Sequence, residues 1–193
     1  VRFDRAGDDH YQTASAFIKS IRGSDPDAAV FWLAKMLAAG EDARFIARRL
    51  VISASEDTGT ADSMGLVVAE AAARAVELIG MPEAQLILAH ATVYLASVPK
   101  SNASAKALWA AQAAIERGGS LEVPIHLRNH ANMWSGEGGR RAEYAYSHDF
   151  EDDDPARYRQ GYLPDGVDGP FYQPTSYGDE ETIKKRLDRI ASL

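Results

Sequence analysis

The sequence predicts an all-α fold, and three observations lead to this class. Apolar residues recur at helical spacing through most of residues 1–120. Glycine, proline and aspartate stand where the helices that carry this pattern would begin and end. No stretch shows the sustained alternation of apolar and polar residues that a half-buried strand requires. The connectors between the predicted helices are about two to five residues long, as in antiparallel helical arrays.

Six helices are expected before residue 120. They run approximately over residues 10–21, 26–39, 42–57, 62–79, 82–97 and 101–117. The helix over 26–39 is apolar nearly all round, so we expect it to be buried on most sides, with Trp32 in the core. The helix over 42–57 is expected to turn four apolar residues inward: Phe45, Ile46, Leu50 and Ile52.

The stretch SIRGSDPDAA at residues 20–29 predicts a rigid elbow between the first two helices. Arg22 and Gly23 close the first helix. Asp25 caps the second, and Pro26 occupies its first position, where the missing N–H leaves no hydrogen bond unmade. We interpret these residues as structural.

The composition changes after residue 120. Five of the eight prolines and nine of the seventeen aromatic residues fall in 121–193. Aromatic rings in glycine- and proline-rich sequence predict an irregular strap whose rings pack on a surface. A final helix is expected over 180–191, with an apolar stripe of Ile183, Leu187 and Ile190. We therefore expect a helical domain over 1–120 and a strap over 121–193 packed on the same domain. The candidate strap or interface anchors are Tyr144, Tyr146, Phe150, Tyr162, Phe171 and Tyr172.

The sequence carries no recognisable catalytic, cofactor-binding or metal-binding motif. GEGGRR at 136–141 lacks the lysine–hydroxyl pair of a phosphate-binding loop, and G-x-S-x-G and H-E-x-x-H are missing. His126 and His130 have no third ligand at metal spacing, so we interpret them as ordinary surface or capping histidines. The carboxylates of Glu56 and Asp57 at a helix end are expected to form a structural salt bridge with a basic side chain.

The charge balance argues against a dedicated DNA-binding module. The net charge is -7, from 21 Lys and Arg against 28 Asp and Glu. A local patch of Arg44, Arg48 and Arg49 remains a candidate for DNA or salt-bridge contacts. No apolar run is long enough to span a bilayer, and the N-terminus lacks the apolar core of a signal peptide, which favours the cytoplasm. Because the chain opens on Val1, we expect it to be a fragment of a longer protein.

Several long segments resemble one family. They are HYQTASAFIKSIRGSDPDAAVFWLAKMLAAGEDARFIARRLVISASEDTGTAD at 10–62, IGMPEAQLILAHATVYLASVPKSN at 79–102, YAYSHDF at 144–150, YLP at 162–164, FYQP at 171–174 and IKKRL at 183–187. They resemble the region after the AAA+ module in the replication-associated recombination protein A family, also called RarA or MgsA. The eukaryotic relative of that family is the Werner-helicase-interacting ATPase.

The resemblance implies a cytoplasmic, clamp-loader-like, DNA-dependent ATPase that acts at stalled or damaged replication forks. It places the site for ATP and magnesium in an N-terminal part that this chain lacks, so the fragment itself would have no enzyme activity and no cofactor. It makes the chain a collar through which family members form tetramers, and it implies DNA and single-strand-binding protein as partners of the parent. The sequence departs from the family at 151–160, EDDDPARYRQ, where relatives carry a Pro-Gly-Gly turn, so the path of the strap there is left open.

Three functions remain as alternatives to an oligomerisation domain. They are a DNA-contacting module that uses the arginines named above with Lys184, Lys185 and Arg186, a docking platform for single-strand-binding or other replication proteins, and an unrecognised enzyme. Self-association is favoured because the helices between residues 26 and 96 have more apolar surface than a lone helical body hides. The aromatic strap is the competing cover for that surface within one chain.

Overall fold

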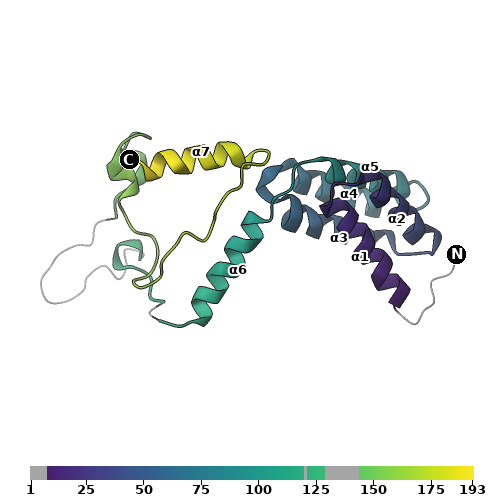
Figure 1. The fold of residues 1–193 in the computed structure, drawn as a ribbon, viewed down its shortest axis with the longest axis horizontal. Coiled ribbons are helices and arrows are strands. Elements are labelled where there is room, and N and C mark those ends of the chain that lie inside the picture. The colour runs from purple at the N-terminus through teal and green to yellow at the C-terminus, as the bar shows by residue number, and fades with distance from the viewer. Residues whose placement is uncertain (1–7, 120, 129–143) are drawn as a thin grey trace, which may run out of the picture. The chain divides into compact units, whose positions relative to one another are not determined.

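A computed structural model describes residues 8–119, 121–128 and 144–193. Every regular element in these ranges is helical (Figure 1). The α-helices are α1 (Asp8–Arg22), α2 (Pro26–Ala38), α3 (Ala43–Ser53), α4 (Met64–Ile79), α5 (Ala84–Ser97), α6 (Ala103–Glu116) and α7 (Glu180–Ala191). The prediction of an all-α fold is confirmed for the described part of the chain.

The chain divides into two compact units. The first comprises residues 1–105 and 174–181, and the second comprises residues 106–173 and 182–193. Both α6 and α7 begin in the first unit and end in the second. A domain boundary near residue 120 stays a prediction, since compact units are not by themselves independently folding domains.

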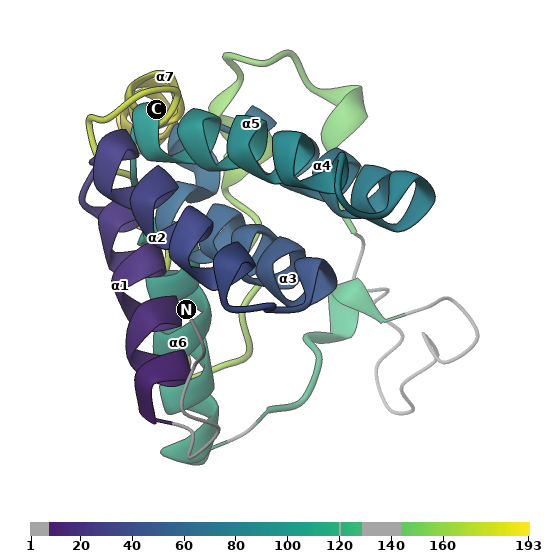
Figure 2. The same ribbon diagram turned by 90° about the vertical axis from the view of Figure 1, so that its right-hand side faces the viewer.

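The first unit is built around α5, which contacts α1, α2, α3 and α4. Figure 2 shows α1, α2 and α3 packed beside the α4–α5 pair. Leu88 and Leu95 of α5 are fully buried, and burial of each leucine side chain contributes about 1.5–3 kcal/mol. Between them lies Ala91, whose small side chain lets neighbouring helices approach closely. The core therefore depends on the alternation of large and small residues along α5.

Only one face of α2 is buried, which corrects the prediction that this helix is covered on most sides. Ala29, Leu33 and Met36 form the buried stripe. Phe31 is 63% exposed, and Trp32 is only partly buried, at the edge of the core. The reason is that α5, and not α2, occupies the centre of the unit, so α2 needs only the stripe that faces its neighbours.

The predicted helix over 42–57 is a shorter α-helix followed by two irregular turns. After α3 come a π-helical turn, η1 (Ala54–Thr58), and a 3-10 turn, η2 (Gly59–Ala61). The prediction that Ile52 faces inward is wrong, because Ile52 is 47% exposed. Ile46, Leu50 and Ser53 set the buried face at helical spacing, and a residue two positions from Leu50 points to the other side of the helix.

The other α-helices agree with their predicted ranges to within two residues. Two of the helices that start later than predicted, α4 and α6, have a capping side chain two residues ahead of their first residue. The Asp62 carboxylate accepts a hydrogen bond of 2.9 Å from the backbone N–H of Met64, and the Ser101 hydroxyl accepts one of 3.2 Å from the N–H of Ala103. These polar side chains satisfy backbone donors that the first turn of a helix leaves unpaired.

Residues 174–181 belong to the first unit and lie against η2. The backbone N–H of Asp179 donates to the carbonyl of Ala61 at 2.8 Å. Gly178 has a φ of 53°, and a Cβ built there would lie 2.1 Å from the Ala61 carbonyl oxygen. Only glycine fits this close approach of two backbones.

A buried carboxylate completes this junction. Glu180 is fully buried and accepts hydrogen bonds from the hydroxyls of Thr60 (2.5 Å), Ser101 (2.7 Å) and Thr175 (2.7 Å), and from the backbone N–H of Thr175 (2.7 Å). We call Thr60, Ser101, Thr175 and Glu180 the Glu180 clasp. It joins three segments that are far apart in the sequence.

In the second unit, side-chain contacts hold the strap. His126 Nε2 donates to the carbonyl of Gly161 at 2.8 Å, and the guanidinium of Arg186 meets the carboxylate of Asp152 through two bonds of 2.9 Å. In its described part ahead of α7, the strap contains short 3-10 turns, which are η3 (Ile125–Leu127), η5 (Ser147–Asp149) and η6 (Pro155–Tyr158). Its described course therefore depends on specific polar pairs and not on long helices.

Candidate functional site

The described residues contain no cluster of three or more His, Cys, Asp or Glu side chains that could hold a metal ion. His126 uses its Nε2 in the bond to Gly161. His130 and the GEGGRR stretch at 136–141 lie outside the described residues. In the part of the chain that is described, no helix is both long and apolar enough to cross a membrane.

The elbow between α1 and α2 is made of helix caps. The N–H of Gly23 donates to the carbonyl of Lys19 at 2.9 Å, at the end of α1. The carboxylate of Asp25 accepts a hydrogen bond of 2.9 Å from the N–H of Ala28, and Pro26 opens α2. These contacts close one helix and start the next within three residues, so they fix the local path of the chain.

Arg22 links the elbow to η1. Its Nε donates to Asp57 at 2.6 Å, and its guanidinium lies 3.7 Å from Glu56. The hydroxyl of Ser53 donates to the other oxygen of Asp57 at 3.1 Å. The hydrogen bond to Asp57 raises the pKa of Arg22. The salt bridge predicted for the Glu56–Asp57 pair is therefore present, and it ties α1 to the π-helical turn.

The three arginines of α3 differ in exposure and surroundings. Arg44 and Arg48 are four residues apart and share an exposed face. Arg44 lies 3.5 Å from Asp42, whose pKa is lowered chiefly by the backbone N–H of Arg44. Arg49 is half-buried and lies on the side of α3 that faces α1. DNA contact by these residues stays a prediction.

The six candidate anchors of the strap fall into two groups. Phe150, Phe171 and Tyr172 are half-buried, whereas Tyr144, Tyr146 and Tyr162 are 42%, 54% and 51% exposed. The Tyr144 and Tyr146 rings meet edge to face with centroids 6.4 Å apart. Their role as anchors or as interface residues stays a prediction.

The structure gives a path for residues 151–160, where the sequence departs from the family pattern. The carboxylate of Asp154 caps η6 by accepting a bond of 2.8 Å from the N–H of Ala156. The Tyr158 hydroxyl donates to the carbonyl of Asp152 at 2.9 Å. Hydrogen bonds from Arg186 and Tyr158 lower the pKa of Asp152. Arg186, considered from the sequence as a DNA contact, is used here as an ion-pair partner.

The described part of the chain is all-α. The polar side chains considered above cap helices, as Asp25 does, or form ion pairs, as Arg22 and Arg186 do. The chain belongs to the family described as MgsA AAA+ ATPase C terminal, whose model matches residues 23–191. The family recognised from the sequence motifs is thus confirmed.

Curated relatives match nearly the whole chain. An AAA domain-containing protein of Mycobacterium tuberculosis is 55% identical over 194 residues, which cover 100% of this chain and 42% of that protein. Replication-associated recombination protein A of Escherichia coli K12 is 40% identical over 194 residues, 99% of this chain and 42% of that protein. ATPase WRNIP1 of Dictyostelium discoideum is 39% identical over 165 residues, 86% of this chain and 19% of that protein. The chain spans less than half the length of these relatives.

Proposed function

We propose that the chain is the C-terminal region of an AAA+ ATPase involved in replication-associated recombination, and that it holds the subunits of this ATPase together as a collar. The family description and the names of the relatives support the first part. In this proposal ATP and magnesium bind to an ATPase module outside the chain, and this region has no enzyme activity. The parent acts in the cytoplasm on DNA, with single-strand-binding protein as a partner.

The observation that carries the proposal is an apolar patch at the turn between α4 and α5. Leu78 is 83% exposed, Leu86 68%, and Ile79 and Met81 54% each. We call these four residues the α4–α5 turn patch. Single exposed apolar residues are normal on a protein surface, but a group of large ones marks an interaction site.

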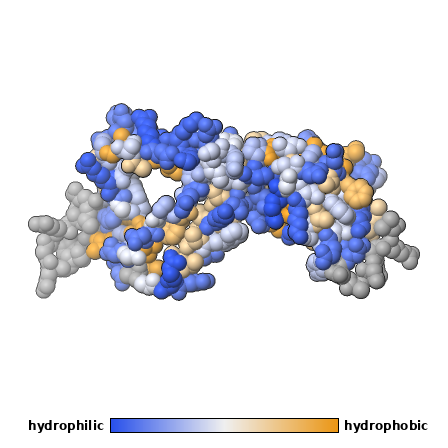
Figure 3. All heavy atoms as spheres, viewed as in Figure 1, coloured by the Kyte–Doolittle hydropathy of each residue, from blue (hydrophilic) through white to orange (hydrophobic). Residues whose placement is uncertain are grey.

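A second apolar surface lies along α6. Leu108, Trp109 and Ile115 are each at least half exposed, and Ala103 is the buried residue of this helix. Figure 3 shows apolar residues following α6. Obligate oligomer interfaces bury about 2,000 Å² or more of largely apolar surface, which fits exposed faces of this kind.

Light scattering coupled to size exclusion tests the proposal. A tetramer has four times the chain mass of 21.0 kDa, about 84 kDa. The double substitution Leu78→Asp with Leu86→Asp is expected to shift the mass toward 21.0 kDa, because it places charges in a closely packed interface. Val123→Asp is the control, since Val123 is 53% exposed and lies outside the patch. A wild-type mass of 21.0 kDa at micromolar concentration would contradict the proposal.

A further inference from the structure

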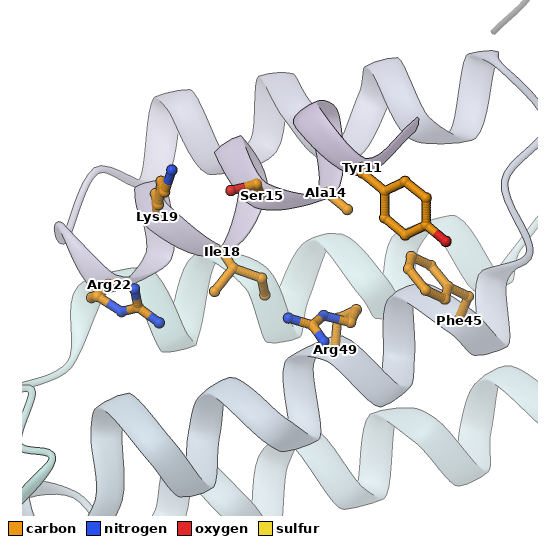
Figure 4. A pocket seen from close by; sticks show the side chains of 8 residues that line it. All are labelled: Tyr11, Ala14, Ser15, Ile18, Lys19, Arg22, Phe45 and Arg49. Carbon is orange, nitrogen blue, oxygen red and sulfur yellow. The ribbon is translucent and has the colours of Figure 1, made fainter. Parts of the chain in front are cut away.

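A pocket of about 290 Å³ lies between α1 and α3 in the first unit (Figure 4). Its floor is apolar, because Ala14 and Ile18 are 8% and 6% exposed. Tyr11 and Phe45 stand together at one end, and Lys19 lies toward the other end. Arg49 reaches in from α3 opposite Ile18. The pocket thus combines an aromatic end, an apolar floor and a basic rim.

Two of its cations are available to a ligand. Arg22, which also lines the pocket, is bound to the Asp57 carboxylate at 2.6 Å. Lys19 and Arg49 form no ion pair with any of the described residues. Lys19 and Arg49, without an ion pair in the part of the chain that is described, thus give a local positive charge in a chain with a net charge of -7. Carboxylate groups on a ligand would complement them.

We propose that this pocket binds a short acidic segment of a partner protein that carries one aromatic or large aliphatic side chain. The apolar side chain of the segment packs on Ile18 between Tyr11 and Phe45. Its flanking carboxylates pair with Lys19 and Arg49. A guanidinium such as that of Arg49 can hold a carboxylate through two parallel hydrogen bonds.

The size and charge of the pocket favour a peptide over other ligands. Pockets for cofactors and drug-sized ligands run from about 300 to 1,000 Å³, so this one suits a single large side chain. Nucleic acid gains its affinity from the neutralisation of several phosphates, whereas this pocket offers two cations that are unpaired among the described residues. Arg44 and Arg48 do not extend the basic rim, because they are not among the residues that line the pocket.

Fluorescence anisotropy with the full 193-residue chain tests the assignment. The probe is a fluorescein-labelled peptide with one phenylalanine between pairs of aspartates. Saturable binding is expected, with weaker binding when the phenylalanine is replaced by alanine or the aspartates by asparagines. A labelled oligothymidylate serves as the nucleic-acid probe. Absence of saturable peptide binding up to millimolar protein would overturn the proposal. Tighter binding of oligothymidylate than of the peptide, if it is lost when Lys19 or Arg49 is replaced by glutamate, would also overturn it.

Charge reversal locates the binding surface. Lys19→Glu and Arg49→Glu are each expected to weaken peptide binding about tenfold, which corresponds to about 1.4 kcal/mol. Arg48→Glu is the matched control, because Arg48 is the neighbouring arginine on α3 and lies outside the pocket. An equal loss in Arg48→Glu would show a general charge effect and would overturn the proposal. Lys19 is exposed, so its substitution leaves the fold intact and keeps the test valid if Arg49→Glu unfolds.

The pocket is distinct from the proposed oligomer interface. None of the residues of the α4–α5 turn patch lines it. A monomeric chain that binds the peptide would therefore contradict the proposed function alone, and a tetramer that fails to bind it would contradict this inference alone.

Discussion

The hydroxyl of Ser101 donates a hydrogen bond of 2.7 Å to the carboxylate of Glu180, although the two residues are 79 positions apart in the sequence. Glu180 is fully buried, and a buried charge is costly unless hydrogen bonds replace its water. The hydroxyls of Thr60 and Thr175 and the backbone N–H of Thr175 provide that replacement. The clasp therefore makes residues 174–181 part of the first unit.

Glu180→Ala is expected to lower the free energy of unfolding by about 2–3 kcal/mol, because it leaves several polar donors without their acceptor. Urea unfolding followed by circular dichroism measures the change. Glu77→Ala is the control, since Glu77 is exposed, and its substitution is expected to cost less than about 0.5 kcal/mol. Equal stabilities of the two variants would show that the clasp contributes nothing.

The same carboxylate predicts a specific acid sensitivity. Burial by itself raises the pKa of Glu180, but the hydrogen bonds from Thr60, Ser101 and Thr175 outweigh it and bring the pKa to about 2, below the ordinary 4.5. A pKa that is lowered in the folded state gives a stabilisation that is complete above 4.5 and is lost as the pH falls toward 2. We expect wild type to lose more stability than Glu180→Gln across this interval. If the free energies of unfolding of the two proteins fall in parallel with pH, the lowered pKa of Glu180 is refuted.

Gly178→Ala is expected to destabilise the chain by more than a positive φ alone explains. A left-handed conformation costs a residue with a Cβ about 1–2 kcal/mol. At Gly178 the new Cβ would also collide with the Ala61 carbonyl, 2.1 Å away. Gly166→Ala is the matched control, because Gly166 has a φ of 78° and no atom within 4 Å of such a Cβ. The midpoint of thermal unfolding should fall further for Gly178→Ala than for Gly166→Ala. Equal decreases in the midpoint would argue against close packing at η2.

The bond between Arg22 and Asp57 is expected to stabilise the junction of α1 with η1. Asp57 is 6% exposed, so Arg22→Ala leaves a largely buried carboxylate with Ser53 as its remaining side-chain donor among the described residues. We expect a loss of about 1–3 kcal/mol in denaturant unfolding. Arg44→Ala removes an exposed ion pair in which Arg44 Nε lies 3.5 Å from Asp42 Oδ1, and it is expected to change the free energy of unfolding by less than about 0.5 kcal/mol. A double-mutant cycle with Asp57→Ala that yields no coupling energy would count against the bond.

The helices could be predicted from the sequence because their signals are local. The apolar spacing, the cap at Asp25 and the proline at position 26 lie within a few residues of the helix starts that they specify. The central position of α5 and the Glu180 clasp could not be predicted, since they depend on which distant segments meet. No local sequence pattern indicates that Glu180 accepts a hydrogen bond from Ser101.

The candidate site was predicted less completely for the same reason. The spacing of Arg44, Arg48 and Arg49 shows that the first two share a face of α3. It does not show that α1 brings Tyr11 and Lys19 to the other side, beside Arg49. The sequence offered the three arginines as one possible basic patch. The structure places Arg49 at the rim of the apolar pocket, whereas Arg44 and Arg48 lie on an exposed face of α3.

Trp32→Ala is expected to cost about 1–2 kcal/mol, less than the 3–5 kcal/mol that truncation of a fully buried tryptophan costs. Trp32 lies at the edge of the core, where its ring packs edge to face with Phe31, with centroids 5.2 Å apart, and lies beneath the ammonium of Lys35 at 5.6 Å. Leu33→Ala is the comparison on the same helix, because Leu33 is 2% exposed and its truncation leaves a cavity that costs about 2–5 kcal/mol. Urea titrations of the two variants should rank Leu33→Ala as the more destabilising. The reverse order would mean that Trp32 is covered in solution, either by the core or by a second copy of the chain.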